Sequence, residues 1–135
     1  MADTMQFDLV SPERKLASVA ATEVRIPGAE GDFTAMPGHA PFLATLRPGL
    51  VVAQSAQGEM RFMVTGGFAE VGAEGVSLLA ERSSPAAEVS QAAFDSILSD
   101  ARAAVTTAAD DNRAAAEKTV NDLTALAAEL GLTAA

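Results

Sequence analysis

Few side chains in this sequence have the chemistry of a catalytic residue. The chain contains one histidine, His39, and no cysteine, which excludes a thiolate nucleophile, a disulfide and a metal centre of several histidines or cysteines. His39 lies within Pro37-Gly38-His39-Ala40-Pro41, a short loop sequence. A lone histidine in such a loop is more often a hydrogen-bonding structural residue than a general base. We therefore expect no catalytic role for His39.

A second candidate is the segment Gly28-Ala29-Glu30-Gly31-Asp32, which places two carboxylates two residues apart. Paired carboxylates can exchange protons with a substrate where burial separates their pKa values. Here the flanking glycines predict an exposed turn in which both carboxylates are solvated. No Gly-Lys-Ser or Gly-Lys-Thr sequence follows these glycines, so the segment is not a phosphate-binding loop. The sequence thus predicts a protein with no active site, no bound cofactor and no metal.

The charge of the chain argues against two classes of partner. Its 135 residues include 18 acidic and 9 basic side chains, a net charge of −9. Nucleic acid and anionic lipid both attract clustered Lys and Arg, so neither is expected to bind. No apolar run approaches the roughly 18–20 residues of a membrane span, and the first residues lack the basic and apolar regions of a secretory signal. We expect an acidic, soluble, intracellular protein that is not inserted in a membrane.

The composition changes near residue 85, which predicts two domains. Residues 1–85 contain nine of the ten glycines and all six prolines, whereas residues 86–135 contain 17 alanines and one glycine. Glycine and proline mark turns, while alanine is the strongest helix former. We therefore predict a β domain over residues 1–85 and a helical hairpin over residues 86–135.

Short alternations of apolar and polar residues predict the strands of the first domain. Met5, Phe7 and Leu9 alternate with polar residues, and so do Val24 and Ile26. This period of two is typical of strands with one buried face. Many short strands separated by turns are typical of an antiparallel sandwich. The predicted fold class is therefore α+β, with an antiparallel β-sandwich followed by an antiparallel two-helix hairpin.

Apolar residues at steps of three and four predict two amphipathic helices in the second domain. Ser90 is a suitable N-cap for the first helix, and Gly131 is suited to end the second. Asp110-Asp111-Asn112 interrupts the pattern and predicts the loop between the helices. A short loop makes consecutive helices antiparallel neighbours. The alanine-rich contact buries little area, so we expect a weakly held hairpin.

A series of motifs over residues 7–81 resembles a known family, the epsilon subunit of the rotary F-type ATP synthase, called delta in mitochondria. The motifs follow one another in the order and at the separations of that family. Six blocks carry the resemblance: Phe7–Glu13, Val24–Phe33, Met36–Phe42, Leu46–Gly49, Gly66–Val71 and Val76–Glu81. After residue 85 only the helical hairpin expected of the family persists.

The resemblance implies a non-catalytic subunit of the central stalk, with a sandwich of about ten strands. Such a subunit turns with the gamma subunit and sits on the c-ring in the membrane. The resemblance implies contact with the c-ring through Glu30, Gly31 and Asp32, and contact with gamma and the c-ring near Gly38 and His39. Thr34-Ala35-Met36 stands where the family usually has Gly-Val/Ile-Leu, which predicts a small shift of this turn. The implied location is peripheral, on the cytoplasmic face of the bacterial inner membrane, since no transit segment is visible.

The resemblance also raises two questions about the hairpin. ATP-binding members carry Ile/Leu-Asp-x-x-Arg at the start of the first helix, whereas no arginine follows Asp95 at that spacing and Arg102 lies too far along. We therefore expect no tight ATP site. In other members the opened hairpin faces an acidic segment of the catalytic beta subunit and blocks ATP hydrolysis. Residues 86–135 carry eight acidic and three basic side chains, so like charges oppose this contact and predict a weak inhibitor. An ATP-sensing regulatory subunit and a free-standing ligand-binding sandwich are the alternatives.

Overall fold

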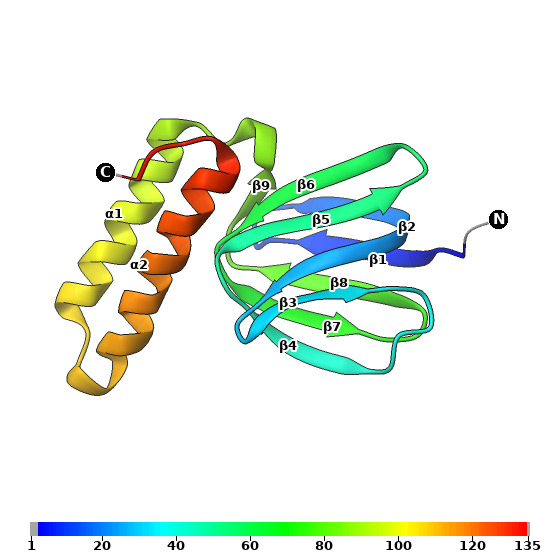
Figure 1. The fold of residues 1–135 in the computed structure, drawn as a ribbon, viewed down its shortest axis with the longest axis horizontal. Helices are drawn as coiled ribbons and strands as arrows, with labels where there is room; N and C mark the ends of the chain where they lie inside the picture. The colour runs from blue at the N-terminus through cyan, green and yellow to red at the C-terminus, as the bar shows by residue number, and fades with distance from the viewer. Residues whose placement is uncertain (1–2, 135) are drawn as a thin grey trace. The chain divides into compact units, whose positions relative to one another are not determined.

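A computed structural model describes residues 3–134 and shows nine strands, followed by two α-helices, in this part of the chain (Figure 1). The chain divides into two compact units, Met1–Ala86 and Ala87–Ala135. The first unit contains the strands and the second contains the helices. The predicted fold class, a β-sandwich followed by a two-helix hairpin, is confirmed.

One long strand organises the sandwich. β2 spans 14 residues, and its first half pairs with β1 while its second half pairs with β5 and β3. β2 therefore takes part in both layers. The strands lie in the order β1-β8-β7-β4-β2-β5-β6-β9, with β3 beside β2. Their bounds are β1 (Met5–Val10), β2 (Lys15–Gly28), β3 (Gly31–Ala35), β4 (Phe42–Leu46), β5 (Gly49–Ser55), β6 (Gly58–Val64), β7 (Gly67–Val71), β8 (Gly75–Ala80) and β9 (Ser83–Pro85).

The core contains the apolar residues that the alternation of apolar and polar residues in the sequence predicted to be buried. Met5, Phe7 and Leu9 are buried on β1, and Val24 and Ile26 are buried on β2. All five belong to one hydrophobic cluster of the sandwich. Alternate side chains of a strand point to the same face, so one apolar face per strand was sufficient to predict them.

One pairing departs from the predicted antiparallel arrangement. β1 and β8 are parallel, with Phe7 beside Val76, whereas the other pairings of the described strands are antiparallel. A parallel pair needs a long connection between its strands, and β2 to β7 supply it here. The residues of β1 show the same alternation whichever way the neighbouring strand runs, so the sequence pattern carried no sign of this direction.

The second unit consists of α1 (Gln91–Thr107) and α2 (Asp110–Leu130), preceded by a short 3-10 turn, η1 (Ala86–Glu88). The Ser90 hydroxyl accepts a hydrogen bond from the Ala93 amide at 3.0 Å, and Gly131 ends α2 in the left-handed conformation with φ of 72°. Both capping predictions are confirmed. Neither helix of the described segment has the length and hydropathy that spanning a bilayer requires.

The loop between the helices lies two residues earlier than predicted. Ala108 and Ala109 form the connection, and Asp110 begins α2. Asp110 and Asp111 occupy the first turn of this helix, where the helix dipole favours negative charge. The acidic residues that predicted a loop therefore stabilise the start of a helix.

Candidate partner-contact site

The acidic turn, residues 28–32, connects β2 to β3. Gly28 and Gly31 face each other across it, and Gly31 has φ of +138°, which L side chains rarely adopt. A Cβ atom at Gly28 would lie 2.6 Å from the Gly31 carbonyl oxygen. Gly28 is therefore required for the close approach of the strands, and Gly31 is required for the backbone conformation of the turn. Glu30 is exposed at the tip, and among the described residues its carboxylate has no hydrogen-bond or ion-pair partner.

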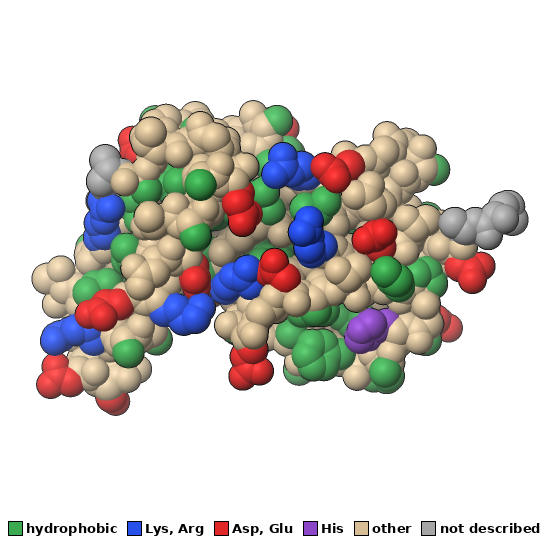
Figure 2. Space-filling view, in the orientation of Figure 1, with side chains coloured by type: hydrophobic (Ala, Val, Ile, Leu, Met, Phe, Trp, Pro, Cys, Tyr) green, Lys and Arg blue, Asp and Glu red, His purple; other side chains and the backbone are tan. Residues whose placement is uncertain are grey.

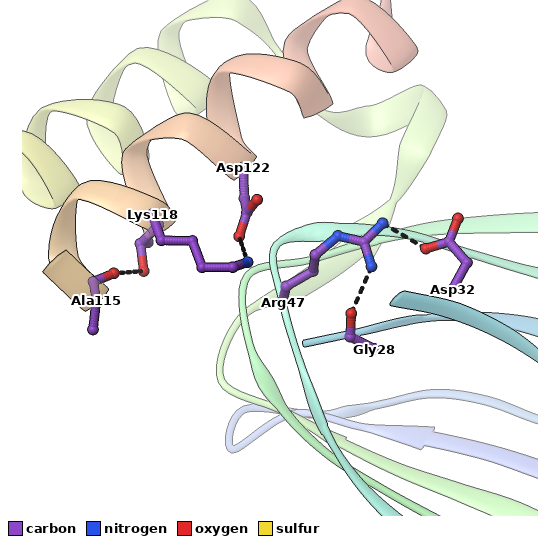
Figure 3. Close-up of polar contacts among 7 residues, drawn as sticks. Gly28, Asp32, Arg47, Ala115, Lys118 and Asp122 are labelled. Atoms are coloured by element: carbon purple, nitrogen blue, oxygen red, sulfur yellow. Dashed lines mark hydrogen bonds and ion pairs between the residues drawn. The ribbon is translucent and has the colours of Figure 1, made fainter. Parts of the chain in front are cut away.

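Arg47 fastens the acidic turn to the connection between β4 and β5 (Figure 3). Its Nη1 donates to the Gly28 carbonyl oxygen at 2.6 Å, and its Nη2 donates to the Asp32 carboxylate at 2.5 Å. Two backbone hydrogen bonds join the same segments, from the Arg47 amide to the Pro27 carbonyl and from the Ala29 amide to the Thr45 carbonyl. The charge of Asp32 is thus balanced within the chain. Glu30 is the acidic side chain of the turn that is free to meet a partner.

The loop of residues 36–41 contains the other two candidate residues. Gly38 adopts φ of +82°, and its amide donates to the Ala73 carbonyl in the turn between β7 and β8. The His39 side chain is half-buried, and its Nδ1 lies 2.7 Å from the Ala40 carbonyl oxygen. Because a carbonyl oxygen can only accept, Nδ1 is the donor in this contact. His39 thus makes a local hydrogen bond that shapes the loop.

The structure does not bring the two candidate loops together. β3 and β4 run between the ends of the sandwich, as Figure 1 shows. Gly28 of the acidic turn pairs with Leu46, the last residue of β4, whereas the loop of residues 36–41 enters β4 at Phe42. The loops therefore lie at opposite ends of β4. Glu30, Gly31 and Asp32 therefore lie apart from Gly38 and His39 and do not form one site with them.

An exposed apolar surface on β4, β7 and β8 was not predicted. Leu43, Phe68 and Leu79 are 70%, 57% and 57% exposed, and we call these three residues the outer apolar face. The strand register places Phe68 directly opposite Leu79, and Leu43 opposite Glu70. Hydrophobic side chains also gather at the surface around β3 and β4 in Figure 2. The only sequence signal was that apolar residues stand next to each other in these strands, so both faces are apolar.

An open hollow of about 640 Å³ adjoins this face and is acidic, with Asp8, Glu70 and Glu74 among its lining residues. Hydrogen bonds from the Ser18 hydroxyl and then the Gln6 amide hold the pKa of Asp8 below its ordinary value of 3.8. The hollow therefore carries negative charge at neutral pH. Within residues 3–134, no group of three or more His, Asp or Glu side chains could hold a metal ion.

A pocket of about 350 Å³ lies between α1 and α2 and is lined in part by Arg102 and Glu117. Asp95 accepts a hydrogen bond from the Gln91 amide at 2.8 Å. Arg102 lies seven positions further along α1, about 10 Å away at roughly 1.5 Å per residue. The Glu117 carboxylate beside Arg102 opposes the phosphates of a nucleotide. The absence of a tight ATP site stays a prediction.

Comparison with known families places residues 4–86 in a family model described as the beta-sandwich domain of the ATP synthase delta/epsilon chain. The chain is 56% identical over 131 residues to the ATP synthase epsilon chain of Fuscovulum blasticum, covering 97% of this chain and 99% of that one. It is 53% identical over 139 residues to the epsilon chain of Paracoccus denitrificans, covering 98% and 94%. It is also 53% identical over 132 residues to the epsilon chain of Rhodobacter capsulatus, covering 98% and 100%.

Two solved structures share the fold at low sequence identity. A chain of the Euglena gracilis mitochondrial ATP synthase, in a structure of its OSCP, F1 and c-ring, superposes with a TM-score of 0.71 at 22% identity, covering 94% of this chain and 81% of that one. A chain from the central stalk and c-ring of the Tetrahymena thermophila mitochondrial ATP synthase gives 0.58 at 16% identity, covering 90% and 94%. The sandwich-and-hairpin architecture is therefore common to all three chains.

Proposed function

The chain belongs to the ATP synthase delta/epsilon family, whose epsilon chains are non-catalytic subunits of that complex, and from this premise we propose that it couples rotation of the c-ring to the catalytic head as part of the central stalk. The relatives named epsilon chain match nearly the whole length of this chain, which supports the proposal. The two solved structures that share the fold are assemblies with a c-ring, and the Tetrahymena thermophila structure is of a central stalk and c-ring. A free-standing ligand-binding sandwich would not explain these matches.

The outer apolar face is the observation that carries this proposal. Complete burial of a Leu or Phe side chain contributes about 1.5–3 kcal/mol, and Leu43, Phe68 and Leu79 are each more than half exposed. Covering all three would therefore contribute roughly 3–5 kcal/mol before the costs of association. We assign this face, with Gly38 and His39 at the neighbouring end of β4, to the gamma subunit. We assign the acidic turn of Glu30, Gly31 and Asp32 to the c-ring.

Capture of the rotor, the complex of gamma and c-ring, by the full-length chain tests the proposal. Leu79→Asp places a charge in the outer apolar face, on β8 beside Phe68, and should weaken binding at least tenfold. Gln57→Asp adds the same charge in the exposed turn between β5 and β6 and should leave binding unchanged. Circular dichroism verifies that both variants fold. A wild-type chain that fails to bind the rotor would refute the proposed function.

We propose further that residues 1–85 act as the stalk domain, and that residues 86–135 form a hairpin that only weakly inhibits hydrolysis. Lys118 pairs with Asp122 at 2.7 Å (Figure 3), and Arg113 pairs with Asp110 at 3.5 Å. These two cations are therefore engaged by acids of their own helix. A new ion pair with an acidic segment of the beta subunit would have to replace one of these existing pairs. The exchange would add little binding free energy, because exposed ion pairs of either kind are screened by water.

Deletion of residues 86–135 tests the weak inhibition. We expect ATP hydrolysis by the purified complex to change less than about twofold, because the acidic hairpin associates poorly with an acidic partner. Assembly is measured in parallel by native mass spectrometry. A several-fold rise in hydrolysis with assembly intact would identify the hairpin as a strong inhibitor.

The ATP-sensing alternative is tested separately by calorimetry with the full-length chain. We expect no binding of ATP with micromolar affinity, since Glu117 and Arg102 both line the interhelical pocket. Micromolar affinity would establish the alternative. The proposed location is the cytoplasmic face of the bacterial inner membrane, where the subunit is held peripherally through the complex.

A further inference from the structure

The helical hairpin is packed unequally along its length. Its buried side chains are Phe94 and Leu98 on α1 and Leu123, Leu126 and Ala127 on α2. Leu98 comes early in α1 and Leu123 comes late in α2, and the two helices run antiparallel (Figure 1). The buried residues therefore share one end of the hairpin. We call this end, residues 90–98 and 123–133, the base, and we call residues 99–122 the tip.

The apolar side chains that are covered in the tip are small. None of residues 99–122 is buried, and the apolar residues that are half-buried there are Ala101, Val105, Ala108, Ala116 and Val120. Val105 and Val120 line an open pocket of about 350 Å³, so the helices do not close fully on each other at this point. Alanine and valine remove less apolar area from water than the leucines and the phenylalanine of the base. The contact between the helices therefore contributes less to stability at the tip than at the base.

The helix ends at the tip are also held less firmly than those at the base. At the base, Ser90 caps the start of α1 and Gly131 caps the end of α2. At the tip, α1 ends at Ala108 and α2 begins after Ala109, and no side chain caps the start of α2 because alanine has no side-chain oxygen. The Arg113 guanidinium donates to the Ala108 carbonyl oxygen, but this bond is exposed and 3.4 Å long. The helices can therefore fray more readily at the tip.

The Gln91 side chain closes the base. Its Oε1 accepts a hydrogen bond from the Thr133 amide at 3.0 Å, and its Nε2 donates to the Thr133 carbonyl oxygen at 2.8 Å. The first residue of α1 is thus joined to the chain just after α2. Separation of the helices at the base has to break both bonds and expose the buried side chains.

We propose that the hairpin opens from its tip while its base stays closed. Neither helical segment of the tip exceeds the roughly 12–15 residues below which an isolated helix is marginal in water, so the separated tip also loses helical structure. This opening differs from release of the whole hairpin, because the bonds of Gln91 and the buried residues of the base are preserved. It gives the chain a loop end that adapts to a partner while the base keeps its shape. The opening is a property of the isolated chain and is independent of the proposed function.

Native-state hydrogen exchange of the full-length chain, followed by NMR at low concentrations of urea, tests the proposal. We expect the amide protection factors at Val105 and Val120 to be at least tenfold lower than at Leu126. Exchange at the tip should depend little on urea, because a local opening exposes little surface, whereas exchange at the base should accelerate. Equal protection and equal urea dependence at tip and base would overturn the proposal, because the hairpin would then open as one unit.

A covalent link across the tip provides a second test. The chain has no cysteine, so Val105→Cys and Val120→Cys introduce a single pair that a short bifunctional thiol reagent can join across the pocket. Joining the pair should raise the protection factors of the tip amides at least tenfold, since the helices can no longer separate there. The same variant without the reagent is the matched control, and circular dichroism verifies that it folds. Unchanged protection after joining would overturn the proposal.

Gln91→Ala removes the closing bonds of the base and distinguishes the two modes of opening. We expect the protection factor at Leu126 to fall about threefold and those at Val105 and Val120 to stay unchanged, because the tip already opens by itself. Gln57→Ala, in the exposed turn between β5 and β6, is the control for loss of a glutamine and should have no effect on the hairpin. An equal fall at base and tip in Gln91→Ala would show that the hairpin opens as a whole and would overturn the proposal.

Discussion

Replacement of Arg47 by methionine should destabilise the sandwich far more than the loss of its exposed ion pair with Asp32 alone would. Methionine keeps an unbranched apolar stem but removes both side-chain hydrogen bonds of the guanidinium. The first goes to the carbonyl of Gly28, a buried residue, and the second goes to the half-exposed Asp32 carboxylate. The first bond fastens the turn, and the second adds a charge pair.

The two bonds differ in magnitude. A charge-assisted hydrogen bond to a buried carbonyl contributes about 1–2 kcal/mol. The Asp32 side chain is 52% exposed, so water screens its pair with Arg47 and reduces the contribution to about 0.2–1 kcal/mol. Arg47→Met should therefore lower the free energy of unfolding by about 2 kcal/mol, equivalent to a fall of roughly 8–15 °C in Tm for a domain of this size. Asp32→Asn should cost less than about 1 kcal/mol.

Thermal unfolding of the full-length chain followed by amide NMR signals of β2 and β5 measures these differences. The chain has no tryptophan and no tyrosine, so its intrinsic fluorescence is unsuitable. Arg25→Met is the matched control, since Arg25 is exposed on β2. Equal effects of Arg47→Met and Arg25→Met would refute the reasoning. A cost of Asp32→Asn as large as that of Arg47→Met would show that the ion pair, and not the carbonyl contact, fastens the turn.

Three further predictions concern other parts of the chain. Gly67→Ala should prevent a stable fold, because its Cβ would lie 1.9 Å from a carbonyl oxygen of β8. Gly58 is also at positive φ but has open space around it, so Gly58→Ala should lower the free energy of unfolding in urea by only about 1 kcal/mol. Gln91→Ala removes both hydrogen bonds between its amide and the backbone of Thr133, and should raise amide exchange after the end of α2 while leaving the sandwich amides unchanged. The folded-state pKa of Asp8 is lowered, so its stabilisation is present above about pH 3.8 and is lost as the pH falls through the lower folded value. Asp8→Asn should therefore make the free energy of unfolding fall less steeply as the pH drops below 3.8. An unchanged pH dependence in acid titrations would contradict this.

The local pattern of the sequence determined the elements and their buried faces. Phe7 and Leu9 belong to the core because period two places them on one side of a strand, whichever strand lies beside it. Ser90 and Gly131 end their helices through contacts within a few residues, so capping rules located them. The glycines of the acidic turn predicted its exposure for the same local reason.

Only the tertiary structure decided what depends on residues far apart in the chain. Arg47 engages Asp32 across 15 residues, and no spacing rule predicts which of two neighbouring carboxylates finds such a partner. Leu43, Phe68 and Leu79 form a common outer face because their strands lie side by side in the sheet. The separation of Glu30 from His39 follows from the direction of β3 and β4. Periodicity reports which side of a strand is buried, but strand order and direction, which bring distant side chains together, are set by the packing of the whole sandwich.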